Sequence, residues 1–188
     1  MSLQIHTTLS RWARRIPTVL RATRFARRED GTAAIEFGLV AAPFLALTFA
    51  IMETAVVFFS SQALETAVAD SSRLIMTGQA QNGGFDQSAF KNAVCAKVHG
   101  LFDCQNGVYV DVKTYTSFSN VSMNNPVDAN GNFINNFTYN PGAQGDIVVV
   151  RLYYQWPVYV SLLGFNLSNM SGGKRLLVAT ATFRNEPY

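Results

Sequence analysis

The chain has 188 residues, a formal net charge of +3 and 48% hydrophobic residues, which suffices for one modest domain and a membrane segment. The charge is uneven, because residues 1–31 carry seven arginines and two acids while residues 32–188 carry a net charge of −2. Nucleic-acid recognition requires a basic patch on the folded part of a protein, so the charge distribution argues against a nucleic-acid partner.

An apolar segment follows the arginines. Phe37–Met52 contains no charged residue, and counting from Thr32 gives 21 residues. As a helix these would extend about 31 Å, enough to cross a hydrocarbon core of about 30 Å. Acidic residues then precede the next cation: Glu53, Glu65 and Asp70. The positive-inside rule therefore predicts a single-pass helix with a cytoplasmic N-terminus and the bulk of the chain across the membrane.

Three ordinary interpretations of this N-terminus compete. A secretory signal would be cut just after its apolar core, but Ala67-Val68-Ala69 follows Met52 by fifteen residues. A mitochondrial transit peptide would explain the arginine-rich, acid-poor residues 1–28 but neither Gly31 nor Glu36. An uncleaved single-pass anchor explains everything except a glutamate inside the apolar segment, and this reading stays open.

A glycine and a glutamate at the start of the apolar segment carry a family resemblance. Gly31-x-x-x-x-Glu36-Phe37 after a basic leader resembles the processing site of type IV prepilin-like proteins. More narrowly, the run from Gly31 to Phe44 followed by Ile51-Met52-Glu53 is similar to the start of TadE/TadG-like proteins of the tight-adherence (Flp) pilus system. The resemblance implies cleavage between Gly31 and Thr32 by a prepilin peptidase of the inner membrane. It also implies a role as a pseudopilin or minor pilin, with other pilins as partners.

The position of Glu36 has a physical interpretation of its own. After cleavage at Gly31 it would be the fifth residue of a chain that begins at Thr32. A carboxylate in apolar surroundings is stable when it is paired, and the N-terminal ammonium group of a neighbouring subunit is a suitable partner. Such a pair would set the register between helices, so Glu36 and Phe37 are the predicted subunit-assembly residues. The alternative is a glutamate that reaches back to water or to Arg28.

The helix is expected to continue beyond the membrane. Apolar residues recur at three- and four-residue spacing, and Gly78 with Gly83-Gly84 would end the pattern. The predicted organisation is a basic cytoplasmic leader at 1–31, a transmembrane helix at 32–59 and a periplasmic domain at 60–188. The residues of this amphipathic stripe are Leu64, Ala67, Val68, Ser71, Leu74 and Ile75.

A second helix and three strands are predicted downstream. The helix covers Asp86 to Leu101, with Asp86 as N-cap. Strand patterns follow around Val108–Val112, over Ile147–Gln155 and over Arg175–Phe183, with an Asn-rich exposed loop or hairpin at 119–145. The predicted fold class is α+β: a long N-terminal hydrophobic helix packed on a small domain with a second helix and an antiparallel sheet.

Cys95 and Cys104 are the only cysteines, and beyond the cytoplasmic membrane such a pair is expected to form a disulfide. A zinc site with His99 and Asp103 is the alternative, but its spacing does not match known ligand patterns. The sequence Asp128–Asn132 resembles the opening of a calcium loop but lacks the closing glutamate, which favours an ordinary turn.

Catalytic motifs are missing from the sequence. It has two histidines and neither a nucleophile elbow nor a phosphate loop. We therefore expect no enzymatic activity, no cofactor and no metal. An aromatic group around Pro157 is interpreted mainly as core, with an exposed subset as a possible subunit contact: Tyr153, Tyr154, Trp156, Tyr159 and Phe165.

Overall fold

A computed structural model describes residues 31–98, 100, 102–160 and 166–188. The chain divides into two compact units, Met1–Leu45 and Ala46–Tyr188, which are treated separately. Helix α2, Thr32–Met76, begins in the first unit and continues into the second. All other described elements belong to the second unit, and the long helix, the short helices and a three-stranded antiparallel sheet confirm the α+β class.

The second half of α2 carries the predicted apolar stripe. Leu64, Ala67, Val68, Ser71 and Ile75 are all buried, and Leu74 packs partly against them. Helix α2 ends at Met76, and the amide of Gly78 donates to the carbonyl of Ile75. Gly78 has a φ of 75°, the left-handed conformation that commonly ends helices. The predicted stripe and the predicted end of the helix are both confirmed.

Three short helices follow. They are α3 (Gln79–Asn82), α4 (Gln87–Cys95) and α5 (Cys104–Gly107). Helix α4 starts where the sequence predicts, because a carboxylate oxygen of Asp86 accepts a hydrogen bond of 2.7 Å from the Ala89 amide. It ends at Cys95, so the expectation of one helix reaching Leu101 was wrong, and part of that expectation lies outside the described residues.

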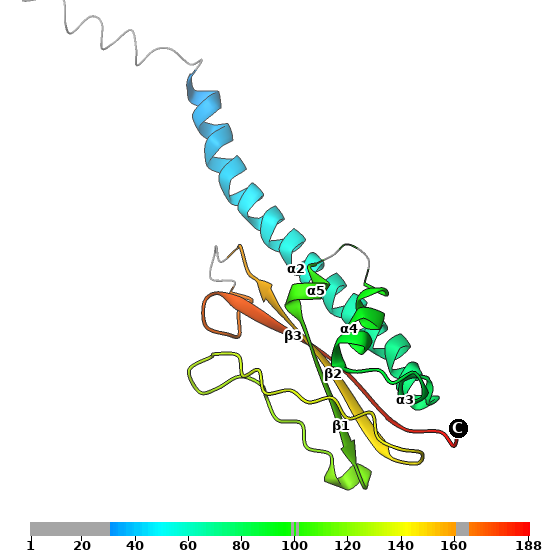
Figure 1. Cartoon of the computed structure of the whole chain (residues 1–188). Coiled ribbons are helices and arrows are strands. Elements are labelled where there is room, and N and C mark those ends of the chain that lie inside the picture. The colour runs from blue at the N-terminus through cyan, green and yellow to red at the C-terminus, as the bar shows by residue number, and fades with distance from the viewer. Residues whose placement is uncertain (1–30, 99, 101, 161–165) are drawn as a thin grey trace, which may run out of the picture. The chain divides into compact units, whose positions relative to one another are not determined.

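The sheet has the order β1-β2-β3, with both strand pairs antiparallel. Its strands are β1 (Val108–Tyr115), β2 (Ile147–Pro157) and β3 (Lys174–Arg184) (Figure 1). Leu152 in the central strand pairs with Val110 on one side and Ala179 on the other. The three predicted strands are confirmed, each longer than the pattern alone indicated.

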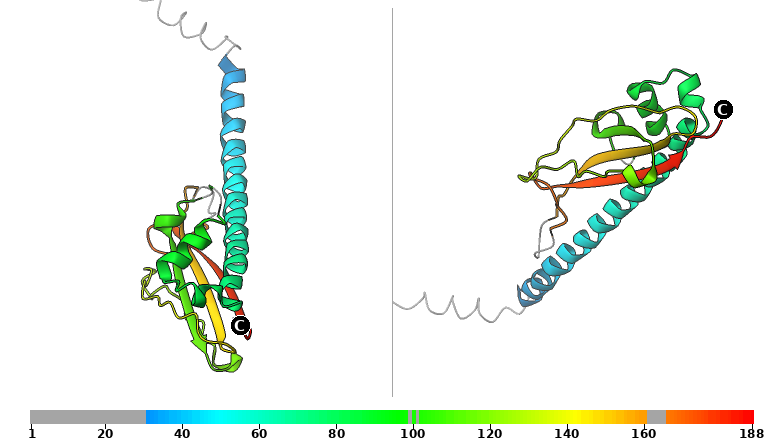
Figure 2. Two further views of the ribbon diagram at one scale, coloured as in Figure 1. Left: turned by 45° about the vertical axis from the view of Figure 1, so that its right-hand side comes forward. Right: turned by 90° about the horizontal axis from the view of Figure 1, so that it is seen from below.

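One face of the sheet forms the main core against α2, α3 and α4 (Figures 1 and 2). Side chains alternate across a strand, so every second residue of each strand reaches this face. The strand residues buried here include Val108, Val110, Val112, Val148, Val150, Leu152, Leu177 and Ala179. From α2 and its neighbours they meet Leu64, Val68, Ile75, Ala80, Phe90 and Val94.

The opposite face of the sheet is also covered. Tyr153, Met170 and Leu176 form a second buried cluster, against which Phe133 and Phe137 of the Asn-rich segment pack. The ring of Phe137 stacks on that of Tyr153 at a centroid distance of 4.8 Å. The expectation of a merely exposed loop at 119–145 was therefore incomplete, because the aromatic residues between its turns cover the sheet.

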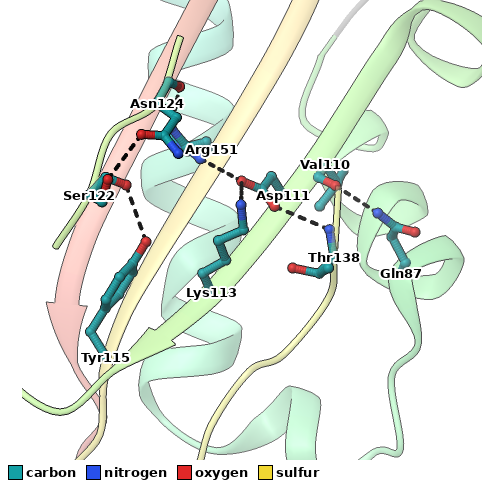
Figure 3. A network of polar contacts seen from close by, with 9 residues as sticks. All are labelled: Gln87, Val110, Asp111, Lys113, Tyr115, Ser122, Asn124, Thr138 and Arg151. Carbon is teal, nitrogen blue, oxygen red and sulfur yellow. Dashed lines mark hydrogen bonds and ion pairs between the residues drawn. The ribbon is translucent and has the colours of Figure 1, made fainter. Parts of the chain in front are cut away.

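A buried polar network joins the Asn-rich segment to this second face (Figure 3). Asp111 accepts from the Thr138 amide at 3.2 Å and from Nη2 of Arg151 at 2.7 Å. Arg151 also donates to the carbonyl of Asn124 at 3.1 Å, and Lys113 lies 3.3 Å from Asp111. Strand β1, expected to be half-buried, therefore has buried residues on both faces.

Candidate functional site

The start of α2 presents the predicted processing residues to solvent. Gly31 is exposed and lies immediately before Thr32, the first residue of the helix. A Cβ added at Gly31 would meet no atom within 4 Å. Among the described residues, nothing therefore obstructs access to the bond between Gly31 and Thr32.

Glu36 and Phe37 lie one turn into α2, and both are exposed. The carboxylate of Glu36 has no hydrogen-bond or ion-pair partner among the residues that the structure describes. Its helix neighbours are apolar and equally open: Ile35 and Leu39 are more than 70% exposed. The Glu36 carboxylate therefore lies on an apolar helix surface, without an ion-pair partner among the described residues.

This apolar surface extends along the helix. Exposed large hydrophobic side chains run from Ile35 to Phe59, and the first exposed polar side chain after Glu36 is that of Gln62. One helix in the described part of the chain, α2, is long and apolar enough to cross a membrane. Exposure of this many apolar side chains is costly in water, which favours a lipid or protein environment around them.

A single apolar helix joined to a small α+β domain is the layout of a protein with one candidate membrane anchor. A family model described as TadE-like protein matches residues 31–73. The chain therefore carries a TadE-like segment, which confirms the resemblance drawn from the sequence. No curated protein and no solved structure was found to match the chain.

A second acid of the apolar segment, Glu53, has partners that the sequence did not reveal. Its two carboxylate oxygens accept hydrogen bonds from the amides of Tyr159 and Val160, at 2.6 and 2.9 Å. Glu53 is half-buried, whereas the side chain of Tyr159 is 81% exposed. Tyr159 is thus an exception to the expected aromatic core, while Tyr153 is buried and Tyr154 and Trp156 pack partly on the main core. Phe165 lies outside the described residues.

Cys95 and Cys104 form a disulfide between the end of α4 and the start of α5, with their Cα atoms 5.6 Å apart. This separation lies within the usual range for a disulfide. The bridge closes a short segment that leads directly into β1. Gly31, Thr32, Glu36 and Phe37 lie in the other unit.

The described residues contain no cluster of metal-ligating side chains, and His99 lies outside them.

The segment Asp128–Asn132 is a turn, as predicted, in which a carboxylate oxygen of Asp128 accepts hydrogen bonds from the amides of Asn130 and Asn132. These hydrogen bonds lower the pKa of Asp128. Burial raises the pKa of Tyr153 to about 12.

Proposed function

We propose that the protein is a minor pilin or pseudopilin of a tight-adherence pilus, matured by a prepilin peptidase that cuts between Gly31 and Thr32. The peptidase and other pilins of the system are its partners, and it has no catalytic role. It resides in the bacterial inner membrane with residues 1–31 in the cytoplasm, 32–59 in the membrane and 60–188 in the periplasm.

The TadE-like match beginning at Gly31 carries this proposal. The charge distribution agrees with it, because the seven arginines all lie in the leader that cleavage would remove. The exposed glycine agrees as well, since a residue without a side chain leaves an extended backbone accessible to a protease. Helix α2 begins at Thr32, directly after the proposed cut, so the mature chain would start with this helix.

Glu36 then becomes a pairing residue between subunits. On the bare helix its carboxylate stands among exposed apolar side chains without a described partner. In an assembly, the ammonium group of Thr32 on a neighbouring helix would neutralise it and fix the axial register. Phe37, 74% exposed, would pack beside that pair.

An uncleaved single-pass protein whose periplasmic domain supports the pilus machinery is the second candidate function. It is favoured by the same apolar helix and the same charge asymmetry, and differs only in retaining residues 1–31.

Mass spectrometry of the mature N-terminus separates the two functions. With an active peptidase we expect the chain to begin at Thr32, and with an inactive peptidase to retain the leader. Gly31→Leu should abolish cleavage. Gly38→Leu is the matched control, because Gly38 is also exposed and an added Cβ there also meets no atom within 4 Å. A leader retained beside active peptidase would support the uncleaved scaffold instead.

A further inference from the structure

The bond between Glu53 and the segment after β2 joins two parts of the second unit that are distant in sequence. Strand β2 ends at Pro157, and the amide of Val158 still pairs with the carbonyl of Gly173. The next two amides, of Tyr159 and Val160, turn to the Glu53 carboxylate. The segment Tyr159–Val160 is thereby fixed against α2 at the level of Glu53.

The negative charge of Glu53, close to an apolar helix segment, requires hydrogen-bond donors such as these two amides. An acid in a membrane helix is costly at the centre, and the cost falls towards the ends. Hydrogen bonds to a charged group are among the stronger ones in proteins. The two amides that donate to Glu53 therefore offset part of the cost of placing its carboxylate at the edge of a hydrocarbon region.

If α2 spans a membrane, its exposed surface gives an expected depth for Glu53. Phe58 and Phe59 are 64% and 62% exposed, and the first exposed polar residue beyond them is Gln62. Glu53 precedes Phe59 by six residues, or about 9 Å along the axis. The headgroup layer on each side of a bilayer is about 5–8 Å thick. With Phe59 at its outer limit, Glu53 lies at the boundary between headgroups and hydrocarbon.

We propose that Tyr159 and Val160 form a second membrane contact, held at headgroup depth by the Glu53 carboxylate. The inference rests on the membrane anchoring in the proposed function. Tyrosine suits this depth because its ring is apolar and its hydroxyl can reach water, which enriches it at membrane interfaces. The contact would couple the second unit to the lipid surface at a point outside α2 itself.

A lipid surface is the occupant that these observations favour. The Tyr159 amide lies beside Glu53, within the stretch of α2 whose exposed apolar side chains continue the candidate membrane span: Leu47, Phe49, Ile51, Met52, Val56, Phe58 and Phe59. The proposed contact is thus continuous with the membrane segment. Phe118 is also exposed, but it follows the end of β1, whereas the start of β1 pairs with the part of β2 that leads to Tyr159; this makes Phe118 a control.

The test uses the full chain in phosphatidylethanolamine–phosphatidylglycerol vesicles containing lipids brominated in the upper acyl chain. Trp12→Phe and Trp156→Phe remove the native tryptophans, and one reporter is added per variant: Tyr159→Trp, Leu47→Trp or Phe118→Trp. We expect Tyr159→Trp to be quenched several-fold more than Phe118→Trp, with Leu47→Trp also strongly quenched. An unquenched Tyr159→Trp beside a quenched Leu47→Trp would overturn the second contact and leave the anchor intact. An unquenched Leu47→Trp would overturn the anchor.

Glu53→Ala tests the positioning role. It should reduce quenching of Tyr159→Trp several-fold and leave that of Leu47→Trp unchanged. Glu53→Gln keeps one acceptor oxygen and should give an intermediate value, with unchanged thermal melting as the evidence of folding. Equal quenching of Tyr159→Trp in all three backgrounds would exclude Glu53 as the residue that holds this contact.

Discussion

Asp111 and Arg151 face each other across β1 and β2, with Oδ2 and Nη2 2.7 Å apart. Both side chains are buried, and Asp111 is only 1% exposed. Together they bond main-chain groups at Thr138 and Asn124, so that the pair attaches both ends of the Asn-rich segment to the sheet. The pair is a structural element of the second unit.

Arg151→Met should destabilise the protein by about 3–5 kcal/mol, because it leaves the Asp111 carboxylate buried with much of its compensation removed. Lys113→Met is the control: it also removes a cation from Asp111, but the Lys113 side chain is 38% exposed. Partly exposed pairs contribute at most about 1 kcal/mol. The stability of both variants is measured by thermal melting of the full chain in detergent, with near-ultraviolet circular dichroism as the signal. Equal losses would contradict a specific role for Arg151.

Asp111 also illustrates what local sequence patterns predict. Alternation in β1 placed Val108, Val110 and Val112 on a common face correctly, because that property depends only on the two-residue period of a strand. The same pattern marks Asp111 as a polar residue on the other face. Its burial depends on Arg151, 40 residues later, and on a segment whose asparagines indicate turns but not where its phenylalanines pack.

Among the candidate site residues, too, the sequence predicts local features but not contacts between distant segments. Gly31 and Glu36 are candidates from the sequence because their spacing and the adjoining charge change are local features. Asp86 could be identified as an N-cap for the same reason. The contact between Tyr159 and Glu53 could not, because it joins residues 106 positions apart in the sequence. An aromatic residue after a buried strand is ordinarily read as core.

Gly78→Ala should destabilise the protein more than Gly84→Ala. Both glycines have positive φ, 75° and 62°, so alanine is strained by about 1–2 kcal/mol at either position. At Gly78 a Cβ would also overlap the ring of Tyr188, whereas at Gly84 it would meet no atom within 4 Å. The difference between the two melting temperatures isolates the ring contact. Adding Tyr188→Ala to Gly78→Ala should remove that difference, and a persistent difference would contradict this explanation.

Loss of the Cys95–Cys104 disulfide should cost about 2.5–3 kcal/mol, as expected for closure of a loop of about ten residues. Cys95→Ser with Cys104→Ser should lower the melting temperature by roughly 10 °C. Reductant should lower the melting temperature of the parent protein by the same amount and leave the double variant unchanged. A response of the double variant to reductant would show that the effect does not come from this bond.

The N-cap of α4 should weaken in acid. The pKa of Asp86 is lowered chiefly by the hydrogen bond from the Ala89 amide, so the folded state favours the ionised carboxylate. Its stabilising effect is fully present above the ordinary pKa of 3.8 and is lost as the pH falls through the lower value of the folded state.

Hydrogen exchange of the Ala89 amide, corrected for intrinsic pH dependence, should therefore lose protection below pH 3.8 in the parent protein. Asp86→Asn keeps an acceptor without a titrating group, so its protection should vary less over this range. Asp86→Ala should show weak protection at every pH. The same pH dependence in the parent and in Asp86→Asn would assign the acid response to other carboxylates, because only the parent has a titrating cap at this helix.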